Sequence, residues 1–396
     1  MSLTQFHQAQ TASDKRSALQ AAIASDARVV CDPQVKAWLA MRWRQLFVQA
    51  AANDAQVLKR VKSPIGLRRD QRSARQKVAE RFLLDASPSD YDSDCLPAPT
   101  RAPRATLMFC PGFINGLLPV HGFGDAFPAL VAEGWHIVSA DAHPVRSCEA
   151  NVADLQRTIS EGYGYWPTPD TPARTGEMQH DIILFGYSKG GPDMLSLLAA
   201  HPELKPRIKA VFTWAGANGG SFTADKIYQL IKDLPINVVS QRLHDFLRLL
   251  MPGMRRDGRL RRLEEYDMIG GVKSLTTTDR EAFLATQSAK IDALDIPLFC
   301  LTAATKLLEV PTIQMADWLA LSKHCANNDM QVTQAQASLE LPMATSLAVL
   351  HGHHWDVSYP PFPRHLRIGS PNLDHPFPRQ AAVMAIGQLC VELGLA

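Results

Sequence analysis

The stretch that decides the fold runs from residue 181 to residue 191 and reads Asp-Ile-Ile-Leu-Phe-Gly-Tyr-Ser-Lys-Gly-Gly. Its apolar run, residues 182–185, predicts a buried strand. A Gly-x-Ser-x-Gly pattern follows around Ser188, and apolar residues at helical spacing follow from Met194 to Leu198. A strand, this pattern and a helix in succession predict a tight turn that exposes the serine hydroxyl. Ser188 is therefore the candidate nucleophile, and a glycine-rich helix entry with Ser188 as a plain cap is the alternative.

A serine that attacks a carbonyl needs two backbone N–H donors for the oxyanion that forms. Lys189 follows the nucleophile and offers one of them. The second is expected after an earlier apolar run, Thr106–Cys110, where Gly112 permits close backbone approach. The N–H of Phe113 is our candidate, with Ile114 in reserve, and an ordinary turn is the alternative reading.

The serine also needs a base, and histidine has a pKa suited to that task. Residues 351–357 read His-Gly-His-His-Trp-Asp-Val and follow the last strand-like run. We expect His354 to be the base, ahead of His353 and His351. A structural histidine cluster or a weak metal site, with His351 and His353 sharing one ligand, is the alternative.

The acid that orients the base is expected between the serine and the histidine in the chain. Asp329 lies in a short polar turn, 25 residues before His354, where its carboxylate can accept the Nδ1–H of the imidazole. A surface turn is the alternative reading of Asp329. Glu309 is the reserve candidate for the acid.

Short apolar runs alternate with helical patterns over the second and larger part of the chain. This alternation predicts a mostly parallel sheet covered by helices on both faces. The runs expected to form its strands are Thr106–Cys110, Trp135–Ala140, Asp181–Gly186, Lys209–Trp214, Leu298–Thr302 and Ser346–Leu350.

Residues 1–85 are expected to form a helical N-terminal extension. Asp32 and Pro33 predict the start of a helix there, and residues 78–84 are an expected early strand. A basic run between Lys59 and Lys77 reads as a solvated helix face.

The expected organisation continues with a linker over 86–104, a first core part over 105–222, a helical lid insertion over 223–290 and a second core part over 291–396. In the insertion, Thr278 and Glu281 have the spacing of a capping box. The basic stretch Arg255–Arg262 reads as a solvated loop.

Composition narrows the class of protein. The 396 residues carry a net charge of +2 and are 46% apolar, so a large core is expected and a nucleic-acid partner is not. We expect no secretory signal and no integral membrane segment, because no run approaches the ~18 apolar residues a span needs. The seven scattered cysteines favour reduced thiols in a cytoplasmic protein.

From about Thr106 onward, these residues resemble the α/β-hydrolase superfamily, and within it lipase- and esterase-like members with a helical lid. The segments that carry the resemblance are Pro111–Phe113, Gly186–Gly190, Gly216–Ser221, Gly271–Thr276 with Arg280, Asn328–Val332 and His354–Asp356. Pro111 stands where such proteins often have histidine, and Met330 where they have glycine.

The resemblance implies a triad of Ser188, Asp329 and His354 that hydrolyses a small hydrophobic acyl ester without metal or organic cofactor. An acyltransferase or thioesterase would use the same residues. A non-catalytic binding protein of this fold is the remaining alternative.

Overall fold

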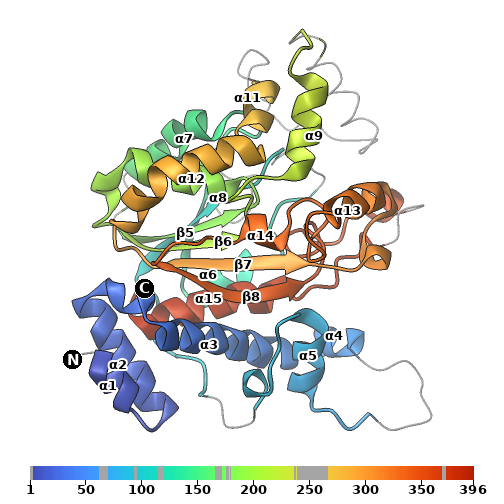
Figure 1. Cartoon of the computed structure of the whole chain (residues 1–396). Helices are drawn as coiled ribbons and strands as arrows, with labels where there is room; N and C mark the ends of the chain where they lie inside the picture. The colour runs from blue at the N-terminus through green and yellow to red at the C-terminus, as the bar shows by residue number, and fades with distance from the viewer. Residues whose placement is uncertain are drawn as a thin grey trace.

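The computed structural model describes residues 3–61, 70–92, 96–114, 120–165, 172–174, 178, 180–235, 238, 266–367 and 372–396. Their strands form one sheet of eight in the order β4-β3-β2-β1-β5-β6-β7-β8 (Figure 1). The strands are β1 Ala105–Cys110, β2 His136–Ala140, β3 Tyr163–Tyr165, β4 Pro172–Arg174, β5 Asp181–Tyr187, β6 Ile208–Trp214, β7 Leu298–Ala304 and β8 Ala344–His351.

The prediction of a mostly parallel sheet is confirmed. All six apolar runs form strands, and β1, β2, β5, β6, β7 and β8 pair in parallel. The short strands β3 and β4 pair antiparallel at one end of the sheet. Neither contains an apolar run, so nothing in the sequence pattern marked them.

Helices cover both faces of the sheet. On one face lie α7 (Cys148–Glu161), α8 (Gly190–Ala200) and α12 (Thr277–Asp292); on the other lie α3 (Pro33–Ala52), α6 (Phe127–Ala132) and α15 (Arg379–Leu393) (Figure 1). The other labelled helices are α1 Leu3–Gln8, α2 Ala12–Ser25, α4 Ala55–Arg60, α5 Ala74–Phe82, α9 Phe222–Ile231, α11 Met268–Lys273, α13 Met315–Leu321 and α14 Gln334–Ala337.

The N-terminal helices share the core of the sheet. The expected cap of α3 is confirmed, because the Asp32 carboxylate accepts from the N–H groups of Gln34 and Val35. Within α3, Trp43 and Phe47 stack at 5.5 Å between ring centroids, and Trp43 meets Trp214 of β6 edge-on. The predicted extension therefore packs as part of one hydrophobic core.

The strand expected at residues 78–84 is wrong. Residues Ala74–Phe82 form α5, whose N-cap Ser73 accepts from the Gln76 N–H. The buried side chains of α5 are Val78, Ala79 and Phe82, and their spacing is that of one helical face. Extended pairing is limited to Leu83, which forms an isolated antiparallel bridge with Leu350 of β8.

The cap expected at Thr278 is also displaced. Thr276 is the N-cap of α12, because its hydroxyl accepts from the Asp279 N–H at 3.3 Å. The stretch Arg255–Arg262 lies outside the described residues, and the domain boundaries given above stay predictions.

No helix in the described ranges is long and apolar enough to cross a membrane. The six cysteines with described positions are all unpaired.

Candidate active site

Ser188 lies at the bend between β5 and α8. Its φ of +53° is in the left-handed region, as a tight strand-to-helix turn requires. A Cβ on Gly190 would lie 2.0 Å from the carbonyl oxygen of Cys110, and one on Gly186 would lie 2.6 Å from that of Gly190. Glycine is needed at both positions because the backbone of β1 and the turn itself fill the space. Ser188 keeps a partly exposed side chain.

The imidazole of His354 reaches Ser188 from the loop after β8. Its Nε2 lies 2.9 Å from the Ser188 Oγ. Two hydrogen bonds to the backbone of His354 hold this loop. The Tyr187 hydroxyl donates to the His354 carbonyl at 2.9 Å, and the His354 N–H donates to the Asp329 carbonyl at 2.9 Å. Position 187 varies freely in the sequence pattern, so the pattern gave no sign of this Tyr187 contact.

Asp329 completes a continuous chain of hydrogen bonds. Its Oδ2 lies 2.6 Å from the Nδ1 of His354, and both side chains are at most 2% exposed. The other carboxylate oxygen accepts from the N–H groups of Gln331 at 3.0 Å and Val332 at 2.7 Å. These two bonds fix the carboxylate in the turn, so that one oxygen faces the imidazole.

The reserve candidate, Glu309, lies beside a different imidazole. Its Oε2 is 2.7 Å from the Nε2 of His351, the last residue of β8. This hydrogen bond lowers the pKa of Glu309 to about 2. The opposite ring nitrogen of His351 is 3.4 Å from Arg81 of α5. His351 thus has a carboxylate partner that its sequence neighbourhood did not reveal.

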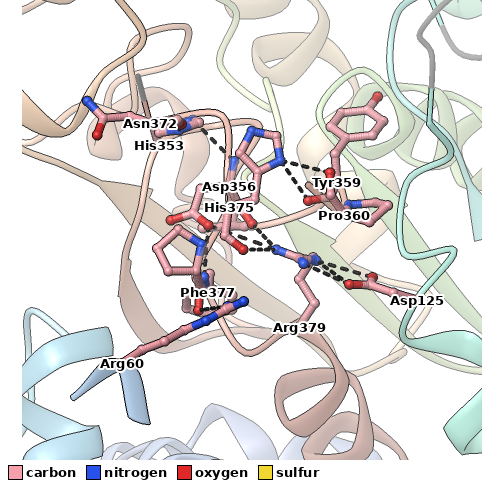
Figure 2. Close-up of polar contacts among 12 residues, drawn as sticks. Arg60, Asp125, His353, Asp356, Tyr359, Pro360, Asn372, His375, Phe377 and Arg379 are labelled. Atoms are coloured by element: carbon pink, nitrogen blue, oxygen red, sulfur yellow. Dashed lines mark hydrogen bonds and ion pairs between the residues drawn. The ribbon is translucent and has the colours of Figure 1, made fainter. Parts of the chain in front are cut away.

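His353 belongs to a buried polar network (Figure 2). Its Nε2 donates to the Asn372 carbonyl at 2.8 Å, and its Nδ1 accepts from the Asp356 N–H at 3.1 Å. Burial lowers the pKa of His353 and raises that of Asp356. These contacts are those of a structural cluster, and the described residues contain no group of three or more His, Cys, Asp or Glu side chains that could hold a metal.

Arg379, the first residue of α15, ties this network to the segment that precedes α6. Its guanidinium donates to the carbonyl oxygens of Asp356 at 2.7 Å and His375 at 3.2 Å, and pairs with Asp125 at 2.7 Å (Figure 2). The loop that carries His354 is therefore anchored by the buried guanidinium of Arg379.

The backbone donors near Ser188 differ in their availability. The N–H of Ile114 donates to the Pro144 carbonyl at 2.9 Å, so the reserve donor is already occupied. The N–H groups of Phe113 and Lys189 have no acceptor among the described residues. A Cβ on Gly112 would lie 3.0 Å from the Cβ of Ser188, which shows how closely the chain before Phe113 passes the serine.

The Lys189 side chain is a feature that the sequence analysis did not single out. Its ammonium lies 2.5 Å from the Asp193 carboxylate, and both side chains are 1% exposed. In the sequence, the four-residue spacing of Lys189 and Asp193 at the start of the expected helix could have indicated this ion pair.

Comparison with known proteins bears on the fold. No protein-family model matches the chain, and no curated protein matches it in sequence. Among solved structures, a metagenomic carboxyl esterase matches with a TM-score of 0.62 and 19% identity over 88% of this chain and 90% of that one.

Two lipases are similar at lower scores. The lipase of Staphylococcus hyicus has a TM-score of 0.48 and 14% identity over 76% of this chain and 99% of that one. The mature lipase BlEst2 of Bacillus licheniformis has a TM-score of 0.43 and 21% identity over 66% and 89%. This chain shares the fold of the carboxyl esterase over nearly its whole length, and that fold is the α/β-hydrolase fold.

Proposed function

We propose that this protein is a serine hydrolase that cleaves carboxylic esters with a hydrophobic acyl group. The observation that carries the proposal is the hydrogen-bonded chain from the Ser188 hydroxyl through His354 to Asp329, with distances of 2.9 and 2.6 Å. Three side chains that are far apart in the sequence meet here in the order that nucleophilic acyl transfer requires.

The reaction proceeds in two steps. Ser188 Oγ attacks the acyl carbonyl while His354 Nε2 takes its proton, and Asp329 stabilises the imidazolium that forms. The N–H groups of Phe113 and Lys189 hold the oxyanion. His354 then protonates the leaving alcohol, and the acyl group stays on Ser188. A water molecule, deprotonated by His354, releases the acid in the second half of the cycle.

The burial of the pair supports this mechanism. Because Asp329 and His354 are almost fully removed from water, the carboxylate acts on the imidazolium through a low local dielectric. Ser188 alone of the three retains contact with solvent, which leaves the nucleophile open to a substrate.

The surroundings of the serine support an apolar acyl group. Phe113, whose N–H is the proposed donor, packs with Val145 and Met268 in a small hydrophobic cluster. An acyl chain bound beside the oxyanion donors would meet these apolar side chains.

The test is a series of p-nitrophenyl esters of rising chain length, hydrolysed by the purified protein. We expect turnover, with a preference that rises beyond acetate. A fluorophosphonate probe should label the wild type and not the Ser188→Ala variant. A well-folded wild-type protein that neither turns over any ester nor takes the label would contradict the proposal and favour a non-catalytic binding protein.

A further inference from the structure

An ion pair is buried directly behind the proposed nucleophile. Lys189, the residue after Ser188, and Asp193, one helical turn later, are both 1% exposed and lie 2.5 Å apart. Burying two charges carries a large desolvation penalty, and apolar residues of similar volume often give equal or greater stability at such sites. Fold stability alone therefore gives no reason for this pair.

The pair is anchored to a second helix. The other oxygen of Asp193 accepts from the Asn151 amide of α7 at 2.9 Å, and the same amide donates to the His143 carbonyl at 3.1 Å. Asp193 is thus fixed by α7, and through the ion pair it fixes the side chain of Lys189.

A further buried cation interacts with the pair. Arg280 of α12 is 2% exposed, donates to the Asn218 carbonyl at 3.0 Å, and interacts electrostatically with Asp193. The neighbouring Cys148 thiol has its pKa raised to about 11 by burial and is neutral at pH 7. Asp193 and the half-buried Asp279 both interact with Arg280, so the Lys189–Asp193 pair belongs to a network of charges held between α8 and α12.

Lys189 is also the residue at which α8 begins. Its backbone is already helical, with φ −55° and ψ −29°, and no side chain caps this end of the helix. The orientation of the Lys189 N–H thus depends on how the first turn is held, and the ion pair spans that turn.

We propose that the Lys189 side chain, held by Asp193, which Asn151 anchors, is a positioning group that aims the Lys189 N–H at the oxyanion. This inference rests on the proposed function. An oxyanion donor that is slightly misplaced loses part of the roughly 10²–10³-fold that such a donor contributes to kcat.

The deciding variant replaces both charges together, as Lys189→Met with Asp193→Leu, so that neither member of the pair is left without the other, while Arg280 keeps its hydrogen bond to the Asn218 carbonyl. We expect its Tm to stay close to that of the wild type, because the volume is kept and the lost desolvation penalty of the pair offsets the lost contacts of Asp193 with Asn151 and Arg280. The kcat for the best p-nitrophenyl ester should fall by about 10- to 100-fold with KM nearly unchanged. The rate of fluorophosphonate labelling should fall in parallel.

A matched control is available on the neighbouring helix. Arg157 and Glu161 form an exposed pair with the same spacing, 3.1 Å apart. Changing both to glutamine should leave kcat and KM as in the wild type. The single variant Asn151→Leu keeps both charges but removes the anchor, and it should lower kcat in the same direction by a smaller factor.

A folded double variant with wild-type kcat would overturn the inference while leaving the proposed function intact. If the double variant does not fold, wild-type kcat in Asn151→Leu overturns it instead. An inactive wild-type protein would refute the proposed function first, and this inference with it.

Discussion

At the scale of the residue, Met330 occupies a backbone position that favours glycine. Its φ is +77°, and its side chain is fully buried. The left-handed conformation costs a non-glycine residue roughly 1–2 kcal/mol, whereas burial of a methionine contributes about 1.5–3 kcal/mol. Packing thus offsets the strain of the turn that presents Asp329 to His354.

The variant Met330→Gly should therefore destabilise the protein. The cavity costs about 2–5 kcal/mol, and relief of strain returns only roughly 1–2 kcal/mol. The turn itself is kept, so kcat should change by no more than a few-fold. Urea unfolding measures the effect, with Met330→Leu as the volume-matched control. A glycine variant more stable than the wild type would show that the side chain contributes nothing.

The choice of acid is tested by a pair of isosteric changes. Asp329→Asn should lower kcat by about 10⁴, as in triads where the wrong imidazole tautomer results. Glu309→Gln should leave kcat close to that of the wild type, because Glu309 contacts His351 and not His354. Steady-state kinetics of the two variants decides between them, and the opposite ranking would make Glu309 the acid.

At the scale of the element, features that are encoded locally along the chain could be predicted from the sequence. Each strand buried on both faces is a continuous apolar run, so β1 and β5 could be located from composition alone. The glycine-flanked serine, Ser188, could be placed for the same reason, because its context is local.

Contacts between distant loops could not be predicted in this way. That Glu309 meets His351 depends on how the loops after β7 and β8 lie in space, and the expectation that Asp329 serves His354 rested on chain order and on the resemblance, not on a local pattern. The buried state of Lys189 depends likewise on α7, whose Asn151 anchors its partner. Residues 78–84 were mistaken for a strand because a short apolar run fits either period.

The edge strand β8 is covered by a segment from the N-terminal part. The N–H of Leu84 donates to the Val349 carbonyl at 2.8 Å, and the N–H of Val349 donates to the Asp85 carboxylate at 3.0 Å. An uncovered edge would offer unpaired backbone groups to another chain.

The variant Leu84→Pro removes the first of these bonds and should open the edge. We expect destabilisation by about 1–3 kcal/mol from the unsatisfied carbonyl, together with self-association seen by size-exclusion chromatography. Leu84→Ala is the control, because this side chain is 44% exposed and its backbone bond persists. A monomeric proline variant of unchanged stability would show that this segment does not protect β8.

At the scale of the whole molecule, the network behind His354 links the N-terminal helices to the site. Phe377 stacks on Phe47 of α3 at 5.8 Å, and its N–H donates to the Asp356 carboxylate at 2.8 Å (Figure 2). Phe377, which lies just before α15, therefore joins the aromatic core to the loop that carries His354.

This link makes the protein sensitive to acid. Burial lowers the pKa of His353 and lowers that of His375 strongly. Both rings are thus neutral in the folded state down to a pH at which the unfolded chain, with an ordinary pKa of about 6.5, already binds protons. Folding stability is full above about pH 6.5 and falls as the pH drops below it, by up to about 1.4 kcal/mol per pH unit for each imidazole. The raised pKa of Asp356 acts in the opposite sense: the folded state takes up this proton above the ordinary carboxyl pKa of about 3.9, so its contribution to stability grows as the pH falls toward that value.

The variant His375→Asn isolates one of these groups. Its amide can donate as Nδ1 does to the Tyr359 carbonyl at 2.9 Å, and asparagine tolerates the φ of +44° found at this position. Between pH 6.5 and 5, we expect the unfolding free energy of the variant to fall less steeply with falling pH than that of the wild type. The difference in slope should correspond to about one bound proton, measured by urea unfolding at each pH. His201→Asn, which removes a surface imidazole beside Glu203, is the control and should keep the wild-type slope. An unchanged slope in His375→Asn would mean that the acid sensitivity lies elsewhere.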